Sequence, residues 1–486
     1  MSSRRFPIFP LLALLLVLAA ALRLFHIDYR SLWTDEFRTL FSIRLPLADL
    51  LRERLSYGHF PTYFVLLKYW TAIFGDTEFA LRLPSLICVV AAIPFIFFAA
   101  RGAWGEPAAW WASIFYLLNA RAVWAAQEAR PYGLVMLAAA AALHALIRAL
   151  NGSRAHWWGL FVFWSLLGLV SHATYLFIFA GQALVTALWM LRSRNWRAGW
   201  IVSILILAVS IAAAYFWLGS HAAHHVEKAA TGKSHGLDLS LFRDGTLDVF
   251  WGAERFEFWK GSKNIFILLV LALLFFAWRA SRRQAPGADV PRCAPLAALS
   301  AAWAFSILFV MLVVSSFQAD VVEPRYFAPG LGGACLLMGC AVGSIRGRLQ
   351  IGAGGLVALI LAINAAAWLW SPGEQVRHAV RYVAERRAPD EPVLFCKDTN
   401  SALMAEYYRL GVVPQGFSRD ELDPEALKSQ LNRYVHGAPG FWLILYKEEK
   451  SPIVKVTHEW SAARYSEVED RRFVKTRVRH WRAAAR

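Results

Sequence analysis

The stretch Ser31-Leu32-Trp33-Thr34-Asp35-Glu36 places two adjacent carboxylates directly after a first long apolar segment, residues 7–26. A membrane-spanning helix needs about 20 predominantly apolar residues, so the chain is expected to leave the hydrocarbon core here. Thr34 is expected to cap a helix over residues 35–45, with both carboxylates in its first turn, where the helix dipole favours their ionised form. The pair has two interpretations at this stage: an acidic helix cap at a membrane surface, or a catalytic site.

Composition identifies the class of protein. Of 486 residues, 58% are hydrophobic and 17% are charged, and the apolar residues occur in long runs. Soluble proteins carry more charge and shorter apolar runs, so an α-helical polytopic membrane protein is predicted. The formal net charge of +17 lies in short basic clusters between the apolar runs. Such clusters are typical of cytoplasmic loops, and nucleic-acid binding is not expected.

Eleven apolar segments are predicted to span the membrane, at residues 7–26, 80–100, 106–122, 132–149, 157–174, 175–191, 199–219, 264–279, 295–316, 327–344 and 350–370. A further candidate, residues 61–74, would reach only about 21 Å as a helix at ~1.5 Å per residue. It also carries Lys68 near its centre. Leaving it out places the basic clusters on one side of the membrane. The positive-inside rule therefore predicts an interfacial helix at 61–74, a cytoplasmic N-terminus and a periplasmic C-terminus.

The character of the sequence changes after residue 370. Residues 1–370 are predicted to form a transmembrane catalytic domain, with residues 28–79 as its first periplasmic loop. Residues 371–486 carry charge throughout and short alternating patterns, which predict a small periplasmic α/β domain. Its expected elements are helices at 374–388, 402–410 and 424–435 and strands at 393–396, 441–446 and 473–480.

The predicted periplasmic face brings several kinds of side chain to the side of the two carboxylates. Its arginines are Arg82, Arg121, Arg130 and Arg325. Arg121 runs against the positive-inside trend, which indicates another role for it, such as contact with an anionic ligand. A carboxylate can take a proton from an attacking hydroxyl or amine, and arginines bind phosphate oxygens and stabilise a phosphate leaving group. This combination is consistent with displacement of a lipid phosphate from a sugar by an acceptor nucleophile.

Several ordered motifs resemble those of the polyprenyl-phosphate-dependent GT-C glycosyltransferases of family 39 type. That group includes protein O-mannosyltransferases and bacterial aminoarabinose lipid A transferases. Residues 31–36 resemble its S-L-W-x-D-E motif, and His59-Phe60-Pro61 resembles the start of H-P-P-L-Y, with Phe60 in place of the first proline. Residues 82–85 resemble R-L-P-S, residues 127–134 resemble Q-E-A-R-P-Y-x-L, and Pro324-Arg325-Tyr326 resembles P-R-Y. The similarity is strong over residues 22–150 and diffuse beyond them.

The resemblance implies an enzyme of the bacterial cytoplasmic membrane that moves a sugar from a polyprenyl-phosphate donor to an envelope lipid, glycan or protein. Its usual reaction is an inverting single displacement, for which Asp35 would be the general base. Glu36 would orient that base or bind the acceptor or a metal. Arg82 and Arg130 would line the lipid-phosphate site, and Arg325-Tyr326 would close it. No nucleotide-binding fold and no cofactor are required, because the sugar arrives on a lipid; a divalent metal stays an open alternative.

Other residues have weaker assignments. His59 and Tyr132 lie within the motifs and are assigned to donor or acceptor binding. His172 and Tyr175 either contact the donor or pack between the fifth and sixth spans. His221-x-x-His224-His225, in the long predicted periplasmic segment 220–262, has a spacing that permits two metal ligands. A basic, mobile loop at acidic lipid headgroups explains this segment more simply.

Two other functions stay open. A transporter or lipid flippase would have similar hydrophobicity, but it often shows inverted repeats and ionisable groups at mid-membrane. Here no repeat is visible and the carboxylates gather at one face. A ligase or polymerase that moves a whole glycan from a lipid diphosphate would share the chemistry of the proposed transferase.

Overall fold

The computed structural model describes residues 7–152, 154–194, 196–221, 239–252, 262–282, 294–317, 323–396, 400–416, 424–435, 437–447 and 452–483. The chain divides into two compact units. Unit 1 contains Met1–Phe25 and Pro46–Trp370, and unit 2 contains His26–Leu45 and Ser371–Arg486. The segment with the two carboxylates therefore packs with the C-terminal residues, whereas the rest of the expected first loop belongs to unit 1.

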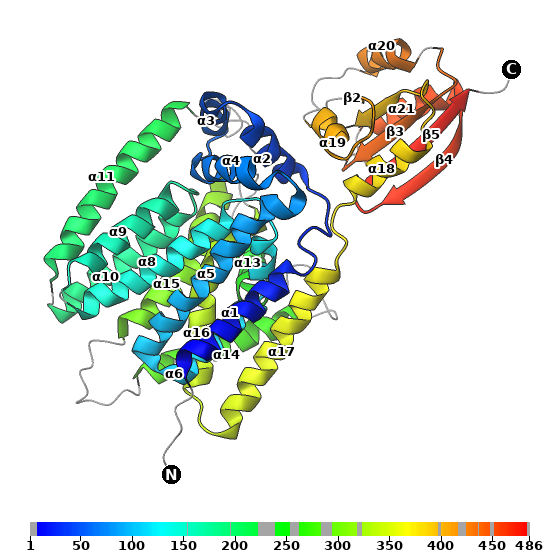
Figure 1. The fold of residues 1–486 in the computed structure, drawn as a ribbon. Helices are drawn as coiled ribbons and strands as arrows, with labels where there is room; N and C mark the ends of the chain where they lie inside the picture. Colours follow the sequence, from blue (N-terminus) through cyan, green and yellow to red (C-terminus); the bar gives the residue numbers. More distant parts are fainter. Residues whose placement is uncertain are drawn as a thin grey trace. The chain divides into compact units, whose positions relative to one another are not determined.

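Unit 1 is a bundle of helices (Figure 1). Its elements are α1 (Ile8–Leu24), α3 (Leu47–Ser56), α4 (Thr62–Phe74), α5 (Glu78–Trp104), α6 (Glu106–Leu118), α7 (Ala120–Ala126), α8 (Tyr132–Asn151), α9 (His156–Leu169), α10 (Tyr175–Ser193), α11 (Ala198–His221), α13 (Leu239–Trp251), α14 (Ser262–Arg282), α15 (Ala294–Phe317), the 3₁₀ helix η2 (Pro324–Gly330), α16 (Leu331–Gly343) and α17 (Arg348–Trp370). Each apolar segment predicted to span the membrane overlaps these helices; residues 106–122 cover α6 and part of α7, and residues 327–344 cover part of η2 and α16.

The predicted spans differ in the length of their helices. Within the described residues, seven helical stretches are long and apolar enough to cross a membrane, and Ile8–Leu24, His156–Leu169 and Asn264–Phe276 are shorter apolar helices. The predicted span 106–122 is interrupted at Asn119, where α6 ends and α7 begins. The Asn119 side chain causes the break: its oxygen accepts from Arg121 N at 2.8 Å, and its amide nitrogen donates to the carbonyls of Val249 and Phe250.

Glycines allow a close helix contact in unit 1, between α6 and α16. A Cβ atom on Gly339 would lie 2.7 Å from the carbonyl oxygen of Ala108, and one on Gly343 would lie 2.7 Å from Ala108 Cα. Backbones this close leave no room for a side chain on α16. Small residues of this kind drive helix association in membranes, because van der Waals packing replaces the hydrophobic effect there.

The stretch expected to be a long basic loop, residues 220–262, contains helix α13. Its residues Gly245–Trp251 are buried. Asn364 of α17 donates to the carbonyl of Trp251 at 2.9 Å, which fixes the end of α13. The expectation of a loop at the lipid headgroups is therefore wrong for the α13 part, because an apolar face at helical spacing packs into unit 1. His224 and His225 lie outside the described residues.

Unit 2 is an α/β unit, as predicted for its C-terminal part. Its strands, in the sheet order β2-β1-β3-β5-β4, are β1 (Val393–Cys396), β2 (Gln415–Gly416), β3 (Gly440–Tyr446), β4 (Tyr465–Phe473) and β5 (Thr476–Ala483). β1 runs parallel to β2 and β3, and β5 runs antiparallel to β3 and β4. Its helices are α2 (Thr34–Arg44), α18 (Val376–Arg386), α19 (Ser401–Tyr407), α20 (Pro424–Val435) and α21 (Pro452–Ala462).

The fully buried strand β3 decides how the helices of unit 2 pack. Its alternate side chains Phe441, Leu443 and Leu445 join one core with Leu431 of α20 and Trp460 of α21. The opposite side chain Trp442 faces α18, where the ring of Tyr382 lies 6.3 Å from it. Helices therefore cover both faces, which explains the continuous apolar run of this strand.

Candidate functional site

Motif residues from two separate segments meet in unit 1 around one imidazole ring, that of His172. The ring centroid of His172 lies 5.4 Å from that of Tyr132 and 5.8 Å from that of Tyr326. The guanidinium groups of Arg130 and Arg325 both interact electrostatically with the same imidazole. We call these five residues the His172 cluster. It joins two positive charges and three aromatic rings, and its guanidinium groups suit a phosphate.

A chain of hydrogen bonds places Arg130 in this cluster. Ser85 Oγ on α5 donates to the carbonyl of Arg130 at 3.2 Å, and the hydroxyl of Tyr63 on α4 lies 3.0 Å from Ser85 Oγ. A Cβ atom on Gly133 would lie 2.7 Å from the carbonyl oxygen of Ser85, so α8 begins in direct contact with α5. The motifs at 59–61, 82–85 and 127–134 are therefore adjacent in space, and Ser85 is the link between the last two.

The turn between α9 and α10 holds His172. Its Nδ1 accepts from Thr174 N at 3.3 Å and lies 3.0 Å from Thr174 Oγ1. Thr62 Oγ1 at the start of α4 donates to the carbonyl of Val170 at 2.6 Å, which ties the turn to the segment after His59. Because Nδ1 accepts, a neutral His172 ring carries its proton on Nε2.

Tyr175 makes packing contacts. Its side chain is buried, and its hydroxyl donates to Ser165 Oγ of α9 at 3.4 Å. A Cβ atom on Gly168 would lie 2.4 Å from the Tyr175 ring, so this ring fills the space between α9 and α10. The two residues of the 172–175 turn therefore differ: Tyr175 packs between α9 and α10, whereas His172 lies beside the motif arginines Arg130 and Arg325.

An arginine that the sequence did not single out lies close to the cluster. Arg54 of α3 is buried, forms an ion pair with Glu53, and has its guanidinium carbon 4.9 Å from the ring centroid of Phe64. Arg130 lies 5.8 Å from the same ring. Sequence reasoning missed Arg54 because its helix mixes charged and apolar residues like any surface helix. The only signal in the sequence was that Arg54 lies five residues before His59, the first residue of the 59–61 motif.

Three further predicted residues of unit 1 lie outside the His172 cluster. Arg82 is buried on α5, three residues before Ser85. His59 follows α3, and its backbone N–H donates to the carbonyl of Arg54 at 2.9 Å. Arg121 forms an ion pair with Asp248 of α13, with Nε 2.8 Å from Oδ1, and stacks over Trp124. A carboxylate of the chain itself thus neutralises Arg121, where an anionic ligand was expected.

Asp35 and Glu36 belong to unit 2, at the second and third positions of α2. The helix begins at Thr34, with Trp33 as the N-cap residue, and Glu36 Oε2 accepts from Trp33 N at 3.4 Å. Thr34 is therefore not the cap, contrary to expectation. Its own N–H and hydroxyl each lie 3.1 Å from the hydroxyl of Tyr446 on β3. Glu36 therefore caps the start of α2, and Asp35 is the carboxylate that stays a candidate for the catalytic base.

The comparisons with known proteins fit this arrangement. Residues 58–218 match the family model of the dolichyl-phosphate-mannose-protein mannosyltransferases. The crystal structure of apo ArnT from Cupriavidus metallidurans superimposes with a TM-score of 0.63 at 13% identity, covering 97% of this chain and 98% of that chain. ArnT bound to undecaprenyl phosphate gives 0.59 at 14% identity, over 96% and 97% of the two chains. The chain has the GT-C glycosyltransferase fold.

A further GT-C protein is similar at greater distance. The apo oligosaccharyltransferase of Archaeoglobus fulgidus shares 12% identity and a TM-score of 0.51, over 92% of this chain and 71% of that chain. No curated protein sequence matches this chain. The resemblance inferred from the motifs is confirmed, and the matched family segment contains both the Arg130 and the His172 parts of the cluster.

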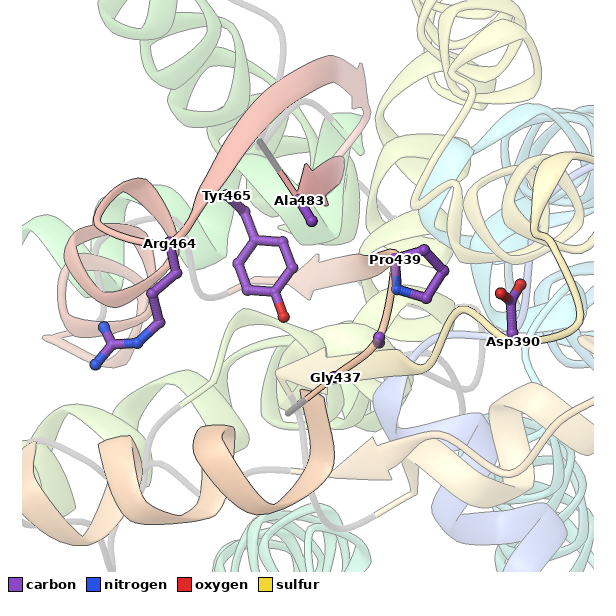
Figure 2. A pocket seen from close by; sticks show the side chains of 7 residues that line it. Asp390, Gly437, Pro439, Arg464, Tyr465 and Ala483 are labelled. Carbon is purple, nitrogen blue, oxygen red and sulfur yellow. The ribbon is translucent and has the colours of Figure 1, made fainter. Parts of the chain in front are cut away.

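Unit 2 also contains a surface pocket of about 530 Å³. Figure 2 shows its lining, Asp390, Gly437, Ala438, Pro439, Arg464, Tyr465 and Ala483, at the end of the sheet where β4 begins and β5 ends. None of these is a predicted site residue. Among the residues that the structure describes, no group of three or more His, Cys, Asp or Glu side chains is arranged to hold a metal ion.

Proposed function

We propose that this protein is an integral-membrane glycosyltransferase that moves a sugar from a polyprenyl-phosphate donor to an envelope lipid, glycan or protein acceptor. The observation that carries the proposal is the meeting of Arg130 and Arg325 around His172. Two guanidinium groups beside aromatic rings form a site for a lipid-linked phosphate. ArnT, a protein of the same fold, has been crystallised bound to undecaprenyl phosphate, which supports a donor of this kind.

The reaction is a single displacement at the anomeric carbon of the sugar. The acceptor hydroxyl or amine attacks this carbon while Asp35 takes its proton, and the bond from carbon to phosphate oxygen breaks. The electron pair leaves with the polyprenyl phosphate, whose growing negative charge Arg130 and Arg325 stabilise. Attack opposite the leaving group inverts the anomeric configuration. Arg82, Tyr132 and Tyr326 contribute to the phosphate site.

The same proposal places the reaction at the periplasmic face of the bacterial cytoplasmic membrane. The support is the asymmetry of basic residues, which puts the N-terminus in the cytoplasm and unit 2 outside. His59 is assigned to the surroundings of the donor, Tyr175 supports the neighbouring turn by packing between α9 and α10, and no metal or other cofactor takes part in the proposed step.

The test compares Asp35→Asn with wild type in cells, followed by mass spectrometry of envelope lipids and glycans. The sugar-modified product is expected to disappear in the variant, because asparagine cannot accept the proton. Asp49→Asn is the matched control: Asp49 is partly exposed on α3 and forms an ion pair with the neighbouring Arg52 at 2.9 Å. It should leave the product unchanged. Wild-type levels of product in a stably inserted Asp35→Asn protein would refute the role of Asp35.

The lipid released in the reaction tests the donor class. A polyprenyl monophosphate is expected in amounts equal to the product, since one sugar leaves one phosphate. Release of a polyprenyl diphosphate would instead favour the ligase or polymerase alternative.

A further inference from the structure

The segment that carries Asp35 is held from both ends of its first turn by residues of the C-terminal part of unit 2. Ser31 Oγ accepts from Arg377 N at 3.1 Å, and Leu32 N donates to the hydroxyl of Tyr408 at 2.7 Å. Thr34 N donates to the hydroxyl of Tyr446 at 3.1 Å. These contacts lie within one compact unit, although the partners are hundreds of residues apart in sequence.

Tyr446 acts as a helix cap supplied by a distant strand. The first N–H groups of a helix have no partner within it, and Thr34 N is the first of these in α2. The Tyr446 hydroxyl accepts from this N–H and donates to Glu374. Glu374 is held in turn by Lys447 Nζ at 2.7 Å and Lys475 Nζ at 3.3 Å. A hydroxyl that donates to a carboxylate is a stronger acceptor, so Glu374 strengthens the cap.

Tyr408 holds the same turn in a second way. Besides its bond to Leu32 N, its ring lies 5.6 Å from the ring of Phe37, in an edge-to-face arrangement. Phe37 is completely buried, and its ring centroid also lies 6.0 Å from that of Tyr407. Backbone bonds before Asp35 and aromatic packing after it therefore restrict the same residue.

We propose that Tyr446 and Tyr408 are positioning residues for Asp35, and that the C-terminal part of unit 2 functions to fix the first turn of α2. This inference rests on the proposed role of Asp35 as base. A base must lie within hydrogen-bonding reach of the acceptor proton, and a displacement of about 1 Å costs on the order of 100-fold in rate. Fraying of the first turn would move Asp35 by that much or more.

The first experiment measures the first turn directly and needs no substrate. Hydrogen–deuterium exchange of residues 31–44 is followed in the full-length protein in lipid nanodiscs, for Tyr446→Phe and Tyr408→Phe. Loss of a cap worth about 1 kcal/mol should speed exchange of this segment about fivefold. Tyr465→Phe is the matched control: its hydroxyl donates to a backbone carbonyl of the same unit, Val435 O at 3.0 Å, but not to the Asp35 segment. It should exchange as wild type does.

The second experiment measures turnover, using the envelope product that wild type makes and Asp35→Asn does not. Tyr446→Phe and Tyr408→Phe should each lower kcat about tenfold and leave the KM for the lipid donor unchanged. A general loss of folded protein would lower the amount of active enzyme without changing kcat per folded molecule. Tyr465→Phe measures how much folded protein is lost when a tyrosine hydroxyl of unit 2 is removed. In Asp35→Asn, adding Tyr446→Phe should cause no further loss.

Glu374 supplies a rescue test. Both Glu374→Gln and Glu374→Ala remove the charge that binds the two lysines, but only glutamine keeps an acceptor for the Tyr446 hydroxyl. Glu374→Gln should retain several times the turnover of Glu374→Ala.

The outcomes separate the two proposals. If Asp35→Asn makes the same product as wild type, the proposed role of Asp35 is refuted. The positioning role of Tyr446 in catalysis is then refuted too, whatever the exchange data show. If Asp35→Asn is inactive while both tyrosine variants match Tyr465→Phe in exchange and in kcat, the positioning role is wrong. Faster exchange with unchanged kcat also overturns it, because the first turn would then not limit the reaction.

Discussion

Arg130 and Arg325 are not interchangeable with lysine at a phosphate site. A guanidinium group donates two parallel hydrogen bonds to phosphate oxygens, whereas an ammonium group acts as a point charge. The contacts of Arg130 with Phe64 also depend on a flat group above a ring. The charge of the His172 cluster and its shape therefore both contribute to the proposed donor site.

Arg130→Lys is expected to lower kcat/KM for the lipid donor by about tenfold to a hundredfold, in line with loss of one charge-assisted hydrogen bond worth roughly 1.5–3 kcal/mol. Steady-state kinetics with the lipid donor measure this. Arg101→Lys, which changes an exposed residue paired with Glu106, is the control. Equal kinetics for the two variants would remove Arg130 from the donor site.

Glu391 links the stability of unit 2 to pH. Burial alone would raise the pKa of this carboxyl, but hydrogen bonds from His480, the backbone N–H of Ala388 and Trp442 lower it below its usual value of 4.5. A folded-state pKa below the unfolded one stabilises the fold at pH values above the unfolded pKa. This stabilisation is lost as the pH falls from about 4.5 through the folded pKa.

Glu391→Gln should therefore remove part of the pH dependence of unfolding below pH 4.5, and lower stability at neutral pH. Thermal unfolding of the intact protein between about pH 3 and 7, followed by near-UV circular dichroism of its tryptophans, checks this. Glu425→Gln, an exposed change on α20 beside Lys428, is the control. A slope that stays the same in Glu391→Gln would contradict the assignment.

At the scale of elements, the α6–α16 contact is one of the close backbone approaches that glycines permit in unit 1. Gly339→Ala should destabilise the protein, because its Cβ atom would meet backbone atoms of α6 within 2.7 Å. Overpacking of this kind costs about 1–3 kcal/mol. Thermal melting in detergent should show a lower Tm for this variant. Gly355→Ala on α17 has no atom within 4 Å of the new Cβ and should melt as wild type does.

The elements also show what the sequence could and could not predict. Apolar length located the membrane helices, and the strands β1 and β3 and the helix α20 were predicted within one residue, since each has a clear apolar pattern. Strand β4 was missed. It lies at the sheet edge, most of its residues are charged or polar and exposed, and it therefore lacks the alternation of apolar and polar side chains that marks a half-buried strand. Helix α13 was missed because its buried turn lies within a basic stretch.

At the scale of the whole molecule, motif order predicted the fold and most of the His172 cluster. Periodicity could not predict that residues 26–45 pack with residues 371–486, since that pairing depends on single hydroxyl groups such as Tyr446 and Tyr408. It also could not find Arg54 or the neutralisation of Arg121 by Asp248. Each of these depends on one contact between segments far apart in the chain, and such contacts leave no local pattern.

The split origin of unit 2 has a consequence for the order in which the protein is made. Thr34 precedes Tyr446 by 412 residues. At a synthesis rate of about 5–20 residues per second, the Asp35 segment waits roughly 20 to 80 seconds for its partners. Every helix of unit 1 except α1 is translated in the meantime. A chain that stops early or fails to complete its insertion thus lacks the cap, and in the proposed mechanism Asp35 is positioned only after the last strands have folded onto residues 26–45.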